Sequence, residues 1–142
     1  MWLYNDTPVD ETLLENHVGF VYMIYNKTDD RSYIGKKLLK FRKTKQVKGK
    51  KKKILVDSDW RVYWGSNKNL QEDVKELGEK HFERRILRIC KTKGECNYWE
   101  AKLQFHYGVL ENSATWYNDH IMVRVHRSHI KEIVALSLRG IV

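Results

Sequence analysis

The stretch GFVYMIYNKTDDRSYIGKK, residues 19–37, decides the fold of this chain. Residues 20–25 form an unbroken apolar run rich in β-branched and aromatic side chains, which is typical of a strand buried on both faces. The polar residues 27–32 that follow predict a turn, and residues 33–35 predict the start of a second strand. The stretch therefore predicts a β-hairpin with a longer loop.

Length and composition favour one soluble domain. The chain has 142 residues, of which 42% are hydrophobic and 32% charged, enough for one core and too few for two domains. No apolar run approaches the roughly 18 residues that a membrane span needs, and no secretory signal is visible. The two cysteines, Cys90 and Cys96, make no disulfide framework, and their spacing fits no common zinc site, so we expect them to pack in the core.

The positive charge of the chain is concentrated in one segment. The net charge is +9, and residues 36–53 contain eleven Lys or Arg and no acid, whereas the rest of the chain holds 16 basic and 18 acidic side chains. A localised cationic segment attracts polyanions, of which nucleic acid is the usual one. An isolated charge run is more often a solvated loop, but its position directly after the hairpin favours a nucleic-acid interface.

Periodicity and capping residues predict the remaining elements. We expect helices within residues 1–18, over 36–44, 67–78 and 95–107, and from Ser128 to near Gly140; strands over 82–90 and 120–127; and an exposed loop over 46–53. The aromatic segment 57–66 fits two interpretations, a packed loop or a platform on which bases stack.

The two tyrosines of the hairpin, Tyr22 and Tyr33, stand in triplets that resemble the signature of the GIY-YIG nuclease superfamily. Residues 20–22 read Phe-Val-Tyr where the family usually has Gly-Ile-Tyr, and residues 33–35 match the second triplet. Downstream, Glu100 is similar to the family's metal-binding glutamate and Asn118 to its terminal asparagine. Residues 65–82 look like the middle of phage-type homing members, so the resemblance covers roughly residues 19–120.

The resemblance implies an α+β fold, a small antiparallel three-stranded sheet flanked by helices, with an extra C-terminal strand and helix. We expect one nuclease domain over residues 1–142. Its core spans about 19–120, a basic insertion about 43–64, and a C-terminal extension about 120–142.

The resemblance also implies roles for individual residues. Glu100 would hold one Mg²⁺ or Mn²⁺, and Tyr22 would accept the proton of the attacking water, with Lys36, Lys37 and Arg42 lowering its pKa. Tyr33 would hydrogen-bond the nucleophile or the phosphate, and Asn118 would brace the wall of the site. The arginine that contacts the phosphate is Arg42, with Arg61 as a competitor. The side chains expected to bind nucleic acid are Lys36, Lys37, Arg61, Lys50, Lys51, Lys52 and Lys53.

These residues together predict a metal-dependent DNA endonuclease that hydrolyses phosphodiester bonds. The alternatives are a nucleic-acid-binding domain that keeps the fold without catalysis, and a small basic RNA-associated protein. One site per chain implies that a double-strand break needs a homodimer or two successive nicks. We expect no membrane association and a cytoplasmic location, in a bacterial host if the protein is phage-encoded.

Overall fold

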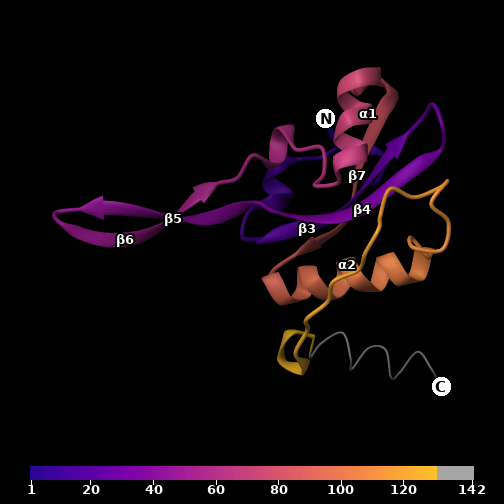
Figure 1. Cartoon of the computed structure of the whole chain (residues 1–142). Coiled ribbons are helices and arrows are strands. Elements are labelled where there is room, and N and C mark those ends of the chain that lie inside the picture. Colours follow the sequence, from indigo (N-terminus) through magenta and orange to yellow (C-terminus); the bar gives the residue numbers. More distant parts are fainter. Residues whose placement is uncertain (131–142) are drawn as a thin grey trace.

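The computed structural model describes residues 1–130 and shows an α+β fold built on a mixed five-stranded sheet (Figure 1). The strand order is β2-β1-β7-β3-β4. The strands are β1 (Trp2–Tyr4), β2 (Thr7–Pro8), β3 (Gly19–Asn26), β4 (Arg31–Leu38) and β7 (Phe82–Cys90). The expected three-stranded sheet is corrected to this larger one: β3 pairs antiparallel with both β4 and β7, and β1 then joins β7 in parallel.

The predicted hairpin is confirmed as β3 and β4, which pair from Gly19 opposite Leu38 to Asn26 opposite Arg31. Successive side chains of β3 enter different cores. Phe20 belongs to one hydrophobic cluster and Val21 to another, and both are fully buried. The strand is therefore covered on both faces, by α1 (Lys68–Leu77) on one side and α2 (Lys93–Tyr107) on the other (Figure 1).

Both central helices and β7 were predicted correctly. Asn67 caps α1 by accepting a hydrogen bond from the backbone N–H of Leu70 at 3.0 Å, and Gly78 ends the helix with a φ of +93°. Thr92 caps α2 by accepting from the N–H of Glu95 at 3.0 Å. Both caps are made by residues next to the helix in sequence, so they can be recognised without knowledge of tertiary contacts.

The helix expected within residues 1–18 is wrong. This segment forms β1, β2 and the short 3₁₀ helix η1 (Glu11–Leu14). Trp2 explains the difference: its side chain is 3% exposed, and its indole N–H donates to the carbonyl of Trp60 at 2.8 Å. Burying this large ring requires the N-terminus to lie along β7, and that pairing is invisible in local sequence.

The basic segment is also different from the prediction. The helix over 36–44 and the loop over 46–53 are replaced by two strands, β5 (Lys40–Val47) and β6 (Lys50–Asp57), which pair antiparallel over their whole length. Lys48 and Gly49 connect them with φ values of +50° and +75°, which is the conformation of a tight two-residue hairpin turn. We call this hairpin, residues 40–57, the arm. Figure 1 shows it projecting from the body of the protein.

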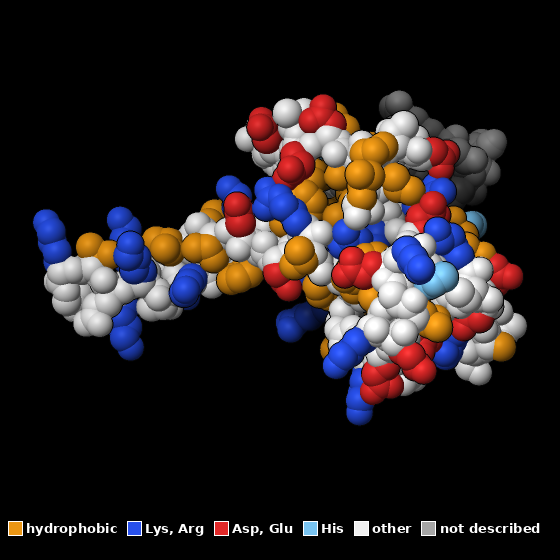
Figure 2. Space-filling view, turned by 90° about the horizontal axis from the view of Figure 1, so that it is seen from above, with side chains coloured by type: hydrophobic (Ala, Val, Ile, Leu, Met, Phe, Trp, Pro, Cys, Tyr) orange, Lys and Arg blue, Asp and Glu red, His pale blue; other side chains and the backbone are white. Residues whose placement is uncertain are grey.

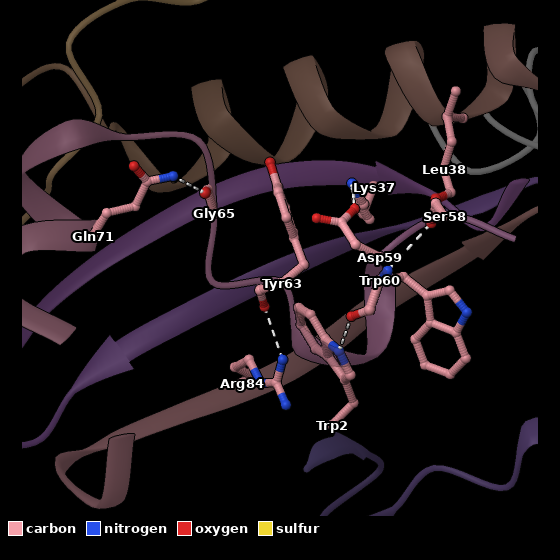
Figure 3. A network of polar contacts seen from close by, with 10 residues as sticks. All are labelled: Trp2, Lys37, Leu38, Ser58, Asp59, Trp60, Tyr63, Gly65, Gln71 and Arg84. Carbon is pink, nitrogen blue, oxygen red and sulfur yellow. Dashed lines mark hydrogen bonds and ion pairs between the residues drawn. The ribbon is translucent and has the colours of Figure 1, made fainter. Parts of the chain in front are cut away.

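Residues 57–66 form a packed loop, one of the two interpretations of this aromatic segment (Figure 3). It contains the 3₁₀ helix η2 (Trp60–Val62), and the Trp60 side chain is buried. The loop is held from several elements: the Ser58 hydroxyl donates to the carbonyl of Leu38 at 2.6 Å, and Arg84 donates to the carbonyl of Tyr63 at 2.8 Å. Arg84 is therefore a buried structural group, and burial lowers its pKa to about 10.

After α2, the chain returns across the sheet edge. The strand expected over 120–127 is wrong, because these residues have no strand partner in the described part of the chain. Residues Arg127–His129 form the 3₁₀ helix η4, and most of the helix predicted from Ser128 to near Gly140 lies outside the described residues. Over residues 1–130, no helix combines the length and the apolar character needed to cross a membrane.

Candidate active site

The candidate site lies at the free edge of β4, the last strand of the sheet. A cavity of about 370 Å³ opens there, between the start of α1, the middle of α2 and the segment that follows α2. Its walls come from elements far apart in sequence. The lining residues are Tyr33, Lys36, Ser66, Asn67, Lys68, Glu100, Gln104, Asn118, Asp119, His120 and Met122.

The edge of β4 is fixed at Ile34 by two side chains. Asn118 accepts a hydrogen bond from the Ile34 N–H at 3.1 Å and donates its own N–H to the Ile34 carbonyl at 2.8 Å. Gln104 donates to the same carbonyl at 2.9 Å. Asn118 thus takes the place of a neighbouring strand and satisfies both edge groups, which are the contacts of a residue that braces the wall.

Glu100 projects from α2 into this cavity. Burial raises the pKa of its carboxyl group, while the Lys36 charge and the Lys36 backbone N–H oppose that rise. The negative charge of Glu100 in turn raises the pKa of both Tyr22 and Tyr33. The two phenols and the carboxylate are therefore within electrostatic reach of one another.

Tyr22 is fully buried and packs in the hydrophobic cluster that contains Trp2 and Phe20, so it does not itself line the cavity. A Cβ atom at Gly35 would come within 2.6 Å of its hydroxyl oxygen, so the glycine of the second triplet is needed to make room for this phenol. The hydroxyl has no hydrogen-bond partner. Burial, followed by the neighbouring Tyr63 and Tyr33, raises the Tyr22 pKa well above its usual value. This corrects the expectation that nearby lysines lower it.

Tyr33 is the tyrosine that reaches the cavity surface. Its hydroxyl pairs with the hydroxyl of Ser66 at 2.9 Å, which ties β4 to the loop before α1. Burial raises its pKa as well. Both signature tyrosines are thus neutral phenols at physiological pH in the free protein.

The predicted basic residues separate into different places. Lys36 lines the cavity, and its ammonium group donates to the side-chain carbonyl of Asn97. Lys37 pairs with Asp59 at 2.6 Å and lies 3.9 Å from the centre of the Tyr63 ring, on the other side of β4 (Figure 3). The lysines at positions 50–53 lie in β6 of the arm.

Neither candidate arginine lies at the cavity. Arg42 is an exposed residue of β5, not of a helix, and it lies opposite Leu55 in the arm. Arg61 forms an ion pair with Glu11 at 2.7 Å and covers the Trp60 ring. The cation that the fold places beside Glu100 is Lys36.

A comparison with protein families decides the identity of the fold. Residues 2–121 match the family described as "Putative endonuclease segE, GIY-YIG domain". The chain belongs to this GIY-YIG family. No match was found among curated proteins or among solved structures.

In this GIY-YIG domain the cavity contains residues that the sequence did not predict as site residues. Gln104 follows Glu100 by one helical turn, so the same helix face presents both, and this spacing was a usable signal. Asp119 and His120 come directly after Asn118, and Lys68 begins α1. None of these three had a local signal. The crossing of residues 116–122 past β4 brings Asp119 and His120 to the cavity, and Lys68 reaches it from the start of α1.

The donors of this GIY-YIG site fit one hard divalent cation. Glu100 supplies a carboxylate oxygen, and the side-chain oxygen of Gln104 is buried without a hydrogen-bond partner. Within residues 1–130 no group of three or more His, Cys, Asp or Glu side chains could hold a metal ion. Magnesium is commonly bound by one or two carboxylates with water and phosphate oxygens completing its shell, so a single carboxylate is sufficient.

Proposed function

We propose that this GIY-YIG protein is a metal-dependent DNA endonuclease that hydrolyses phosphodiester bonds at the edge of β4. The observation that carries the proposal is the convergence of Glu100, Tyr33 and Lys36 on one cavity, within electrostatic reach of the buried Tyr22 phenol. These groups supply a metal-binding oxygen, phenols that can exchange protons and a cation for the phosphate.

Glu100 holds the cation, either Mg²⁺ or Mn²⁺. The bound ion would supply charge stabilisation for the phosphate oxygens of the substrate. The chain itself contributes the carboxylate, a partly buried setting that strengthens its electrostatic interactions, and α2, which fixes the position of the carboxylate against β4.

Tyr22 is the proposed proton acceptor for the attacking water. In the free protein, burial keeps its phenol protonated by raising its pKa well above the usual value. The negative charge of Glu100 is one cause of its high pKa. A cation bound at Glu100 would offset that charge, lower the pKa of Tyr22 and make its phenolate, the form that can accept a proton, more accessible. Tyr33, at the surface of the cavity, orients the water or the phosphate.

Lys36 takes the role of the phosphate-binding cation that the sequence assigned to Arg42 or Arg61. It lies in the cavity, its charge acts on Glu100, and both arginines are elsewhere. Lys68, at the start of α1, lines the same cavity. Two lysines at one cavity suit a bound phosphate.

Over residues 1–130 these groups meet in one cavity, so we expect each binding event to cut one strand. We expect nicked circles to accumulate before linear DNA, and linear DNA to require a second nick or a second copy of the protein. The order of products on a supercoiled plasmid measures this directly.

The decisive experiment is cleavage of a supercoiled plasmid with Mg²⁺, with Mn²⁺ and with a chelator. Glu100→Gln should reduce the rate at least about 100-fold, since a few kcal/mol of transition-state stabilisation is lost. Tyr22→Phe should reduce it by about 100-fold or more, as for other general bases. Glu76→Gln, an exposed glutamate of α1, is the matched control and should cut normally.

Two results would overturn the proposal. Undiminished cleavage by Glu100→Gln would remove the carboxylate from the mechanism. DNA binding by the native protein without cleavage, in the presence of either cation, would favour the non-catalytic alternative.

A further inference from the structure

The arm is the largest feature of the molecule that the cavity does not use. Its 18 residues include nine Lys or Arg and one acid, and every residue of β5 is exposed. Figure 2 shows it standing away from the body, with basic side chains projecting from both of its flanks. It has no core of its own, so packing does not explain its sequence.

The charges of the arm are unbalanced in the free protein. Lys45 lies directly opposite Lys52, and like charges in this arrangement destabilise a strand pair. Over residues 1–130, no ion pair joins a cation of the arm to an acidic side chain. Because a two-stranded hairpin alone is marginally stable, this surface is suited to a polyanion that neutralises it.

The register places cations on both faces of the ribbon. Side chains directly opposite one another share a face, so the alternation along β5 and β6 gives two sets of four. One face carries Lys43, Lys45, Lys50 and Lys52, and the other carries Lys40, Arg42, Lys51 and Lys53. A ribbon lying flat on a polyanion would need cations on one face only. Cations on both faces suit a ribbon that stands between two walls of phosphate.

We propose that the arm enters the major groove of duplex DNA, with one face toward each phosphate backbone. The major groove is about 12 Å wide and admits a two-stranded ribbon, whereas the minor groove is only about 6 Å wide. The proposal rests on the proposed function in one respect: the duplex that the arm holds is the one that the cavity cuts.

The arm is joined to the body of the protein at one point. Only Leu39 separates β4 from β5, and this residue is buried. Its N–H donates to the carbonyl of Val18 at 2.9 Å, and its carbonyl accepts from the N–H of Ser58 at 2.9 Å. Both ends of the arm are thus fixed to the body at one point, which sets the direction in which the ribbon projects.

This connection gives the arm a defined reach. From Lys36 in the cavity to Lys45 near the tip, the chain runs nine residues, nearly all extended. At about 3.3 Å per residue this is about 30 Å, the length of roughly nine base pairs. The arm should therefore hold DNA on one side of the cut, at a distance of about one helical turn.

Binding without divalent cation tests the arm separately from cleavage. The probes are a 30-base-pair DNA duplex, the corresponding single strand and the corresponding RNA duplex, each in a chelating buffer over a range of salt concentrations. The variants are K45Q/K52Q on one face and K51Q/K53Q on the other. The control is K75Q/K80Q, two exposed lysines outside the arm.

Each arm pair should weaken DNA duplex binding roughly tenfold and reduce the slope of log affinity against log salt by about 2, because each phosphate contact contributes about 0.9. The control should leave both unchanged. The arm should also protect guanine N7, an atom of the major groove, from methylation on one side of the bound site. Preserved thermal midpoints would confirm that the variants are folded.

Four results would overturn the proposal. The first two are an equal loss of DNA affinity in the control variant and a loss of DNA affinity from only one of the two arm variants. The third is equal or tighter binding of the RNA duplex, because its major groove is too narrow for a ribbon. The fourth is methylation protection confined to the minor groove. A protein that binds through the arm but never cuts would refute the nuclease proposal and leave the docking proposal standing. If the protein with both arm pairs substituted binds and cuts DNA like the native protein, the docking proposal is refuted and the nuclease proposal stands.

Discussion

Two hairpins of the same length have opposite surroundings in this protein. Both β3–β4 and β5–β6 pair two strands of eight residues antiparallel and without interruption. In the first, β3 is almost wholly buried between two helices. In the second, β5 is exposed throughout. Backbone pairing is therefore common to both, and the side chains decide what each hairpin is for.

The contrast separates stability from recognition. The β3–β4 hairpin is stabilised by apolar burial on both faces and in return holds Tyr33 and Lys36 at fixed positions in the cavity. The arm has its ladder of hydrogen bonds and its tight turn, with little burial, and it presents nine cations to solvent. Substitutions of the same kind in the two hairpins should therefore have unequal effects.

The largest difference is expected for phenylalanine. Phe20→Ala in β3 should cost about 3–5 kcal/mol of unfolding free energy, because a fully buried ring is lost and a cavity remains. Phe41→Ala in β5, whose side chain is 47% exposed, should cost less than about 1 kcal/mol. Denaturant unfolding of both variants measures the difference, and equal losses would mean that the arm is packed against the body in solution.

Glycine gives the second contrast. Gly35→Ala should cost about 1–3 kcal/mol or more and abolish cleavage, because the new methyl group would displace the Tyr22 hydroxyl. Gly49→Ala at the tip of the arm meets no neighbouring atom and should cost only about 1 kcal/mol, from its φ of +75°. Unfolding and nicking assays on the two variants test this. Normal cleavage by Gly35→Ala would show that Tyr22 has room to move.

Asn118→Ala tests the edge of β4. It should cost about 1–3 kcal/mol, because the buried N–H of Ile34 loses its acceptor, and it should also slow cleavage. Asn69→Ala on the exposed face of α1 is the control and should change stability by less than about 0.5 kcal/mol. If the two variants unfold alike, Asn118 does not brace the wall.

The smallest expected effect is a gain in stability, caused by Glu100→Gln, where the other substitutions cause a loss. The folded-state pKa of Glu100 is raised by burial, so its carboxylate, once charged, lowers stability, and this loss is complete above the folded pKa. Without divalent cation at neutral pH, Glu100→Gln should therefore unfold at a temperature equal to or slightly above that of the native protein. The gain should disappear at acid pH, where both forms are neutral.

Thermal unfolding at the two pH values, with Glu76→Gln as the control, measures this small gain. A lower midpoint for Glu100→Gln at neutral pH would show that Lys36 stabilises the carboxylate more than burial destabilises it. Either outcome, combined with lost cleavage, separates a role in catalysis from a role in folding.

The sequence predicted the elements whose signals are local. The apolar run of residues 20–25 predicted β3, and the helical spacing of Leu70, Val74 and Leu77, with Gly78 as a stop, predicted α1. It failed in the arm, because a run of lysines resembles a solvated loop and the alternation of faces carries no apolar signal. It also failed at Trp2, whose partner strand lies more than 80 residues away in the chain.

The candidate site divides in the same way. Tyr22, Tyr33, Glu100 and Asn118 were selected from the triplets and their downstream matches. The choice of Arg42 over Arg61 depended on a helix that does not exist, and the structure brings Lys36 to the cavity instead. Arg42 is close to Gly35 along the chain, but the arm carries it away from the cavity. Separation in sequence therefore does not measure separation in space here.

By itself, the sequence determined the membership of this chain in its family, its central hairpin, its two main helices and the location of its positive charge, because each depends on residues close together in the chain. Only the tertiary structure decided that the basic segment is a two-stranded ribbon, that Tyr22 is a buried neutral phenol, and that Lys36 accompanies Glu100. These depend on which distant segments cover a side chain, and burial sets both its charge state and its neighbours.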